Sequence, residues 1–428
     1  MSYLKQAAAV LLLSAAIVTA PRQTDEAETR MATGCSAAGS SIGAEAGLMP
    51  PSGASRPALL PAGYLHTAGS QIVDQTGRPV RIASVGWFQG FENPDFAMQK
   101  IMQLGFNAVR ISWVDATMRS DLQRIDRIVA AAAHHGIKVI LDHHTNEAGT
   151  PADGYGAQQR NGLWYDSGPG TNGTNGTSVK GTVTQAVFQA HWVEVARRYA
   201  GNSTVIGFDL DNEPLMIPGG STWGDGGVTD IRLMYQTVGN AILAANPDVL
   251  IIAEGPQNYP GRAPWGDLSN VRAAPVQLNR ADRLVYSVHD YPTYVSGVKE
   301  NSGRPKVAGM NRAWGFLVSE KIAPVWIGEM GANLDGTCCH ENIAASQAWA
   351  ATLVDYLNGK LASQGGPSFR GMEQGVSTDW WAWGNLTGQP LDGTLAPDGS
   401  RRPAQYAVYS QLAPGVVCRT GSPVATPG

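Results

Sequence analysis

Charged residues are scarce in this chain, and neither sign dominates among them. Asp, Glu, Lys and Arg make up 15% of the 428 residues, with 31 basic against 35 acidic side chains and a formal net charge of −4. A nucleic-acid-binding protein is expected to show a basic face, so this balance argues against that class. Hydrophobic residues make up 43%, an ordinary value for a globular protein that can bury a sizeable core.

Long hydrophobic runs are also lacking, apart from one stretch near the N-terminus. The run from Ala7 to Ala20 follows a short start that ends in Lys5, and it is too short to span a bilayer. We therefore expect a secreted protein, extracellular or periplasmic, with no membrane span. The expected order is a signal peptide at 1–20, a flexible leader rich in Ala, Gly, Ser and Pro at 21–61, one folded domain at 62–415 and a C-terminal tail at 416–428.

Only four cysteines occur, and no pair of them has the spacing of zinc ligands. Cys338 and Cys339 are adjacent and cannot easily bond each other. A disulfide from Cys418 to Cys338 or Cys339 is therefore the natural pairing in an oxidising compartment. Free buried thiols are an equally weighted alternative.

Strand-like and helix-like segments alternate after residue 80. The strands are apolar runs such as Val139–Leu141, which is typical of strands covered on both faces. Eight of them predict an α/β fold with a single (β/α)8 barrel, long βα loops and an N-terminal hairpin at 65–79; an open doubly wound sheet is the alternative. No Gly-x-Gly-x-x-Gly turn follows the first strand, which argues against nucleotide binding. The expected strands are 80–87, 107–113, 138–144, 205–212, 249–254, 284–291, 324–330 and 378–384, and the expected helices are 95–105, 120–136, 184–200, 229–246, 311–320, 341–360 and 403–412.

Polar and aromatic residues gather where these strands end. Because the carboxyl ends of parallel barrel strands meet at one face, such residues are expected to lie together there, which predicts a catalytic site. Two glutamates among them end strands on different sides of the ring. The strand ends carry Arg110, His144, Asn212, Glu213, His289, Tyr291, Glu329 and Trp383.

Paired carboxyl groups of this kind suit glycoside hydrolysis. One acid protonates the departing oxygen while one carboxylate faces the anomeric carbon, and a separation of ~5–5.5 Å gives retention of configuration where ~6.5–9.5 Å gives inversion. Arg110 and Tyr291 are placed to keep Glu329 ionised, whereas the charge of Glu329 favours a proton on Glu213. Asn212 is placed to bind the sugar 2-hydroxyl.

Four segments together resemble glycoside hydrolase family 5, the cellulase family, and within it the actinobacterial-type retaining endoglucanases. The resemblance extends from about residue 64 to 412. It is carried by Val80-Arg-Ile-Ala-Ser-Val-Gly-Trp-Phe88, by Val205-Ile-Gly-Phe-Asp-Leu-Asp-Asn-Glu-Pro214, by Leu284-Val-Tyr-Ser-Val-His-Asp-Tyr291 and by Ile322-Ala-Pro-Val-Trp-Ile-Gly-Glu329.

The resemblance implies a role for each matched residue. Glu213 would be the acid/base, Glu329 the nucleophile and Arg110 its orienting partner. His144 would contact the sugar beside the scissile bond, and Trp383 would form the platform beneath that sugar. By the same resemblance His289 and Tyr291 would flank the two carboxylates.

Three positions depart from the family pattern. Asp211 stands where the close relatives have His before Asn-Glu-Pro, His143 stands where they have Arg, and Gly384-Asn385 adds a residue after the last Trp. His143-His144 could suggest a metal, but no third ligand pattern supports one, so we expect no metal and no cofactor. His134-His135 ends a helix, where two imidazoles complement the helix dipole.

The chain is rich in glycine and aromatic residues, with 51 Gly, 12 Trp and 13 Tyr, which suits a cleft for a neutral, ring-shaped ligand. Core packing is the alternative interpretation for each tryptophan. The candidate sugar platforms near strand ends and in loops are Trp87, Trp164, Trp223 and Trp265.

The sequence therefore predicts a monomeric hydrolase that cleaves a polysaccharide of the β-1,4-glucan type. β-Mannan or β-1,3-glucan is the alternative substrate for the same machinery. A non-catalytic polysaccharide-binding barrel is the alternative of another class, and the presence of both glutamates argues against it.

Overall fold

The computed structural model describes most of the chain between Leu59 and Ala413. The expected signal peptide, most of the leader, the C-terminal tail, Trp265 and the four cysteines fall outside the described residues, and the disulfide stays a prediction. The described residues are 59–87, 93–146, 159, 161–166, 182–257, 266–296, 303–336, 342–385, 391 and 393–413.

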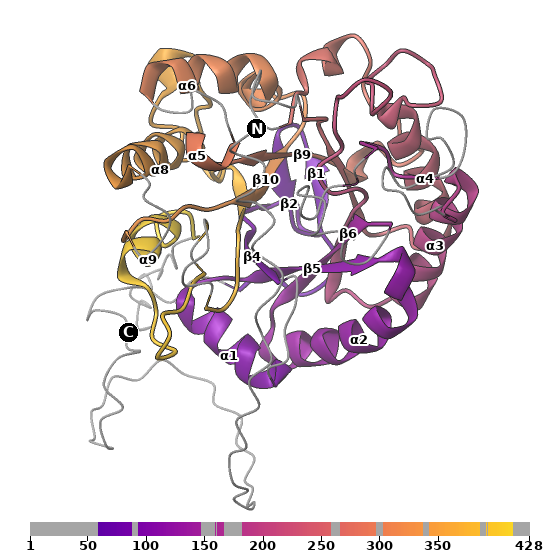
Figure 1. Ribbon diagram of the computed structural model, residues 1–428, viewed down its shortest axis with the longest axis horizontal. Helices are drawn as coiled ribbons and strands as arrows, with labels where there is room; N and C mark the ends of the chain where they lie inside the picture. Colours follow the sequence, from indigo (N-terminus) through magenta and orange to yellow (C-terminus); the bar gives the residue numbers. More distant parts are fainter. Residues whose placement is uncertain are drawn as a thin grey trace, which may run out of the picture.

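Eight parallel strands close into a barrel at the centre of the molecule, which confirms the predicted fold (Figure 1). The strands follow one another around the ring in sequence order, from β4 to β11. All eight are buried, which explains their continuous apolar runs. They are β4 (Ala83–Trp87), β5 (Ala108–Val114), β6 (Lys138–Thr145), β7 (Val205–Asp209), β8 (Leu250–Glu254), β9 (Leu284–Asp290), β10 (Val325–Met330) and β11 (Ser377–Trp380).

Helices surround this barrel (Figure 1). Capping residues in the sequence mark where several of these helices begin or end. The side chains of Asn93, Thr184, Asp230 and Asn342 accept a backbone N–H at the start of α1, α3, α4 and α8. Gly136 ends α2 in the left-handed conformation that glycine adopts readily. The helices are α1 (Pro94–Leu104), α2 (Met118–His135), α3 (Gln185–Arg198), α4 (Ile231–Ala245), α5 (Thr293–Ser296), α6 (Gly303–Met310), α7 (Phe316–Ser319), α8 (Ile343–Leu357) and α9 (Pro403–Tyr409).

Two parts of the expected secondary structure are wrong in extent. The stretch 292–310, between the expected strand 284–291 and the expected helix 311–320, contains α5 and α6, and a π-helical turn at Asn311–Gly315 joins α6 to α7. The sequence of this stretch lacks a helical hydrophobic period, so it reads as a loop. The last strand ends at Trp380, four residues before its expected end, because the chain leaves the sheet there.

A three-stranded sheet lies at the amino-terminal side of the barrel strands. It consists of β1 (His66–Ala68), β2 (Gln71–Val73) and β3 (Pro79–Val80), paired in the order β1-β2-β3, and contains the predicted hairpin. Apolar side chains from this segment pack against residues near the strand starts, which closes that end of the barrel. This cluster contains Leu60, Leu65, Ile72, Ile82, Ala108, Ile140, Ile206, Leu250, Ile252, Val285 and Trp326.

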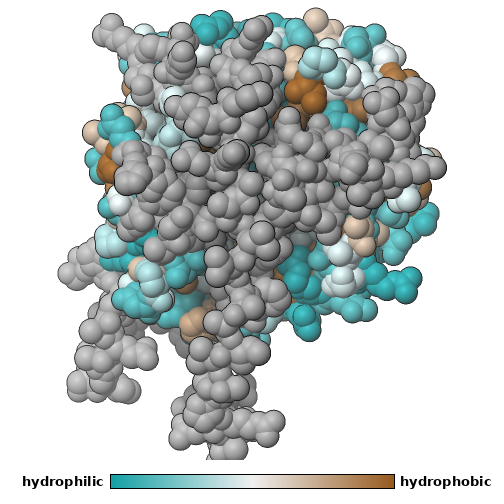
Figure 2. All heavy atoms as spheres, in the orientation of Figure 1, coloured by the Kyte–Doolittle hydropathy of each residue, from teal (hydrophilic) through white to brown (hydrophobic). Residues whose placement is uncertain are grey.

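The described surface exposes few large hydrophobic side chains. On the face in Figure 2 the described residues are mainly hydrophilic, with a few separate hydrophobic patches. Among the helices that the structure describes, none combines the length and hydrophobicity needed to cross a membrane. The large hydrophobic side chains that are exposed are Leu59, Phe96, Val228, Ile322 and Met372.

Leu65 is expected to hold the amino-terminal sheet on the barrel. Its side chain is fully buried, whereas that of Leu59 is 44% exposed. Leu65→Ala should lower the free energy of unfolding by about 2–5 kcal/mol, because it removes buried methyl groups and leaves a cavity. Leu59→Ala should change it by less than about 0.5 kcal/mol. Urea unfolding followed by tryptophan fluorescence measures both, and equal losses would show that the sheet does not close the core.

Candidate functional site

Arg110, on β5, organises the carboxyl end of the barrel. Its guanidinium is fully buried. Nε donates to Asp209 at 2.9 Å and Nη1 donates to Glu329 at 2.7 Å. Nη2 lies 2.8 Å from oxygens of Asp142, Asp209 and Asn212. Burial opposes the charge, but the facing carboxylates of Asp142, Asp209 and Glu329 raise the pKa of Arg110 well above its usual range, so this cation is permanent.

Glu329 lies near the end of β10, with each carboxylate oxygen in a hydrogen bond. Oε1 accepts from Arg110 at 2.7 Å and Oε2 accepts from the Tyr291 hydroxyl at 2.6 Å. Burial and the neighbouring carboxylates of Glu329 and Glu213 raise the pKa of Tyr291 well above its usual range. The phenol therefore keeps its proton and remains a donor, so both oxygens of Glu329 are fixed in position.

Glu213 follows β7 and approaches the same point from another side of the ring. Its backbone has φ of 52°, a left-handed conformation that costs a residue with a side chain roughly 1–3 kcal/mol. Two hydrogen bonds hold this turn: the Glu213 N–H donates to Oε2 of Glu254 at 2.8 Å, and the Asn212 N–H donates to the His143 carbonyl at 2.9 Å. The strained turn directs the Glu213 side chain to His289, whose Nδ1 lies 2.8 Å from Oε1.

The two glutamates lie close enough for both to act on one bond. A carboxylate oxygen of Glu213, a carboxylate oxygen of Glu329 and a ring nitrogen of His289 all lie within 4.8 Å of one another. Retaining glycosidases need ~5–5.5 Å between the two carboxyl groups, and inverting ones need ~6.5–9.5 Å to admit a water. The arrangement matches the retaining geometry.

His289 and Glu254 extend this pair away from the catalytic point. Nε2 of His289 lies 3.5 Å from Glu254, and the Tyr235 hydroxyl donates to the Glu254 carbonyl at 2.9 Å. Burial opposes a charge on His289, but the carboxylates of Glu254, Glu329 and Glu213 raise its pKa to about 10. Burial raises the pKa of Glu254 well above its usual range. The negative charge around His289 therefore keeps its imidazole protonated at neutral pH.

His144, at the end of β6, is fixed next to a partly exposed aromatic ring. Its Nδ1 lies 2.6 Å from Asp142 and 3.2 Å from the Ser112 hydroxyl. The Trp381 ring stacks on the imidazole with centroids 5.4 Å apart and planes at 6°. Gly86 makes room for this tryptophan, since a Cβ there would lie 2.4 Å from the indole.

Trp383, predicted as the sugar platform, is a buried side chain. Its ring is only 6% exposed and packs near Trp87, with centroids 6.4 Å apart. Trp87 and Trp164 are buried core residues, and Trp223 is buried with its Nε1 donating to a backbone carbonyl. Burial leaves these four tryptophans little exposed surface, whereas Trp381 offers a partly exposed ring, and the roles of the four as sugar platforms stay predictions.

Two departures from the family pattern contact each other. Nδ1 of His143 lies 3.4 Å from Asp211, and its Nε2 lies 2.7 Å from Asp115, which also binds His191. Burial opposes a charge on His143, but Asp115 and Asp211 raise its pKa to about 9. The imidazolium of His143 is thus a buried cation between two carboxylates, next to the turn that contains Asn212.

Sequence reasoning missed three residues of this site. Glu254 and Asp379 end strands as single acids with no motif around them, and Trp381 is one of three tryptophans in a short stretch. Asp379 is fully buried near Arg110, and burial raises its pKa well above its usual range. A polar residue at a strand end was the available signal for Glu254, whereas the expected strand 378–384 placed Asp379 near its start.

Known proteins are similar to this chain in sequence. The family described as Cellulase (glycosyl hydrolase family 5) matches residues 73–386. An endoglucanase of Paenibacillus polymyxa is 31% identical over 338 residues, which are 69% of this chain and 77% of that protein. The major extracellular endoglucanase of Xanthomonas campestris is 29% identical over 344 residues, which are 71% of this chain and 64% of that protein.

Solved structures agree with these relatives. The catalytic domain of the Xanthomonas campestris endoglucanase superposes with a TM-score of 0.64 at 25% identity, covering 82% of this chain and 99% of that one. An endocellulase of Pyrococcus horikoshii, solved with cellotetraose, gives a TM-score of 0.64 at 25% identity, covering 82% and 98%. The match over most of the barrel and the convergence of both glutamates lead to one conclusion: this chain belongs to glycosyl hydrolase family 5, the cellulase family.

Proposed function

We propose that this enzyme hydrolyses internal β-1,4-glucosidic bonds with retention of configuration, using Glu329 as nucleophile and Glu213 as acid/base. The observation that carries the proposal is the separation of the two carboxylates, which lie with His289 within 4.8 Å of one another. This distance is shorter than the ~6.5–9.5 Å that an inverting mechanism needs to admit a water.

In the first step Glu329 attacks the anomeric carbon. A new bond forms between a Glu329 oxygen and that carbon, the glycosidic C–O bond breaks, and Glu213 gives its proton to the departing oxygen. Arg110 and Tyr291 keep Glu329 oriented toward the sugar through the bonds at 2.7 and 2.6 Å. His289 holds Glu213 in place for this proton transfer, with Nδ1 2.8 Å from Oε1 of Glu213.

In the second step the roles of Glu213 reverse. Its carboxylate takes a proton from water, the water oxygen bonds to the anomeric carbon, and the ester bond to Glu329 breaks. Two displacements restore the original configuration. His289 contacts both glutamates, at 2.8 Å from Glu213 and 3.6 Å from Glu329, so it is placed to hold Glu213 at the reaction centre in both steps.

Asn212 and Trp381 supply the sugar contacts in this proposal. The Oδ1 of Asn212 accepts from Arg110 at 2.8 Å, while its Nδ2 is buried and has no hydrogen-bond partner among the described residues. An amide N–H in this state suits a sugar 2-hydroxyl, whose binding strengthens in the transition state. Trp381, stacked on His144 and partly exposed, is the proposed platform beneath the sugar.

The relatives support a glucan as the substrate class. The curated relatives from Paenibacillus polymyxa and Xanthomonas campestris are named endoglucanases, and the Pyrococcus horikoshii endocellulase was solved with cellotetraose. The Xanthomonas relative is also named as extracellular. We extend the proposal to a secreted enzyme that acts as a monomer.

Substrate class and stereochemistry can be tested together. Reducing ends should be released from carboxymethylcellulose much faster than from mannan or laminarin. During cleavage of cellotetraose, proton NMR should show the β-anomer of the new reducing end before mutarotation. Faster release from mannan would show that mannan is the preferred substrate. Appearance of the α-anomer first would exclude retention. No activity on any of the three polymers would favour a non-catalytic binding barrel.

Substitution of each glutamate separates the two roles. Glu329→Gln should lower kcat by about 10⁴-fold or more on every substrate, because no ester can form. Glu213→Gln should abolish cleavage of polysaccharide but keep hydrolysis of an aryl glycoside whose leaving group needs no proton. Steady-state kinetics on both substrates measures the difference. Near-normal turnover by Glu329→Gln would show that another group is the nucleophile.

Glu254 is expected to position Glu213 through the backbone. Glu254→Leu removes the acceptor at 2.8 Å from the Glu213 N–H, so the left-handed turn should relax and kcat should fall by about 10²-fold with KM within a factor of three. Glu254→Gln keeps an acceptor oxygen and should lose less. Circular dichroism checks that both variants fold, and a kcat of the Leu variant equal to the parent value would refute the role.

A further inference from the structure

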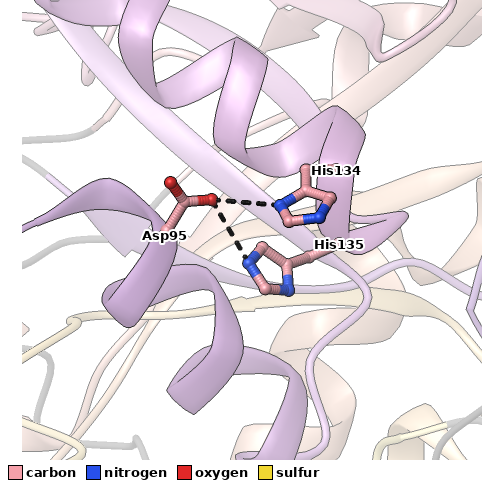
Figure 3. Close-up of side chains that lie close together, drawn as sticks. All are labelled: Asp95, His134 and His135. Carbon is pink, nitrogen blue, oxygen red and sulfur yellow. Dashed lines mark hydrogen bonds and ion pairs between the residues drawn. The ribbon is translucent and has the colours of Figure 1, made fainter. Parts of the chain in front are cut away.

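A cluster of two imidazoles and one carboxylate lies on the outer helices, away from the catalytic residues. Asp95 is in the first turn of α1, and His134 and His135 are the last two residues of α2. Figure 3 shows both rings directed at one oxygen of the Asp95 carboxylate. One donor atom from each residue lies within 4.8 Å of the other two.

The distances fit a shared cation better than two good hydrogen bonds. Nδ1 of His134 lies 3.3 Å and Nε2 of His135 lies 3.4 Å from the same Oδ1 of Asp95. N–H···O bonds are normally about 2.7–3.2 Å long. Two ligands bound at ~2.0–2.1 Å in a tetrahedral zinc site are separated by about 3.3–3.4 Å. Each histidine nitrogen is therefore spaced from the Asp95 oxygen as two ligands of one ion are.

Helix caps hold the backbone positions of the three ligands without an ion. The Asn93 side chain accepts the Asp95 N–H at 3.0 Å, which holds the start of α1. The two histidines end α2 at the Gly136 cap, where the helix dipole favours a positive charge. Nε2 of His135 is buried and makes no hydrogen bond among the described residues, so it has a lone pair or proton left unused.

We propose that Asp95, His134 and His135 form a binding site for a divalent cation of the zinc class. Imidazole with one carboxylate suits Zn²⁺, Ni²⁺, Cu²⁺ or Co²⁺, whereas Mg²⁺ and Ca²⁺ prefer sites made of oxygen alone. The His134 side chain is 76% exposed and Asp95 is 61% exposed, so solvent reaches the site and water completes the coordination.

A bound ion would join the start of α1 to the end of α2. His134 lies 39 residues after Asp95, and the β5 strand passes between their helices in sequence. The ion binds only where both helices are folded, so it stabilises the folded barrel in proportion to its concentration above Kd. The site is a clamp on the outer layer of the barrel, and it takes no part in glycoside hydrolysis.

Zinc titration of the metal-stripped enzyme tests the site. In the parent protein ZnCl₂ at about 100 times Kd should raise Tm by about 3–5 °C. Titration calorimetry should show one zinc ion bound per protein, and substitution of a cluster residue should abolish this binding. His134→Gln and Asp95→Asn should weaken zinc binding by more than about 100-fold, since loss of a supporting residue alone costs 10–100-fold. His66→Asn, on β1, is the matched control and should keep the full shift.

The group Glu213, His289 and Glu329 also places three donor atoms within 4.8 Å, so zinc bound there must be distinguished. Turnover in the presence of zinc separates the two: the clamp leaves kcat unchanged, whereas an ion at the glutamates abolishes activity. A Tm shift that is equal in His134→Gln and the parent, or no shift in the parent, would overturn the proposal. A shift lost in both cluster variants and kept in His66→Asn supports it.

Discussion

The buried guanidinium of Arg110 is the interaction on which the rest of the site depends. It joins four strands of the ring, because its partners lie on β6, at and after β7, and on β10. Burying such a charge is costly, and removal of one partner from a buried ion pair leaves an uncompensated charge worth about 3–5 kcal/mol. A planar fork of five N–H donors matches this set, and the point charge of a lysine would not. The orientation of Glu329 and the arrangement of Asp142, Asp209 and Asn212 around it therefore depend on one side chain.

Acidic side chains outnumber positively charged ones at this end of the barrel, and this imbalance favours protonation of some of the acids. Around Arg110 and His289, several carboxyl groups compete for two positive charges. Burial raises the pKa of Glu254 and of Asp379, so part of the excess charge is removed by protonation. A site that must deliver a proton to a leaving oxygen gains from neighbours that already retain protons. The carboxyl groups are those of Asp142, Asp209, Glu213, Glu254, Glu329 and Asp379.

The fold and the convergence of two glutamates in the candidate site could be predicted from sequence because both depend on short-range patterns. Buried strands give apolar runs, and residues at their carboxyl ends meet at one face, so Glu213 and Glu329 were found without coordinates. Glu254 was not, because its significance depends on a hydrogen bond across 41 residues to the backbone of Glu213. The proposed platform Trp381 lies two residues before the predicted Trp383, since alternation fails once the chain leaves the sheet after Trp380.

The contact between His143 and Asp211 shows why departures from a family pattern have to be interpreted in pairs. Taken singly, an acid before Asn-Glu-Pro and a histidine in place of arginine would each alter the charge behind the acid/base. In the structure they lie 3.4 Å apart, and Asp115 adds a second carboxylate at 2.7 Å. His143 is therefore held as a cation, with its pKa raised to about 9 by Asp115 and Asp211 against the opposing effect of burial. The two carboxylates balance that charge, so the pair of departures adds no unpaired charge behind Asn212 and Glu213.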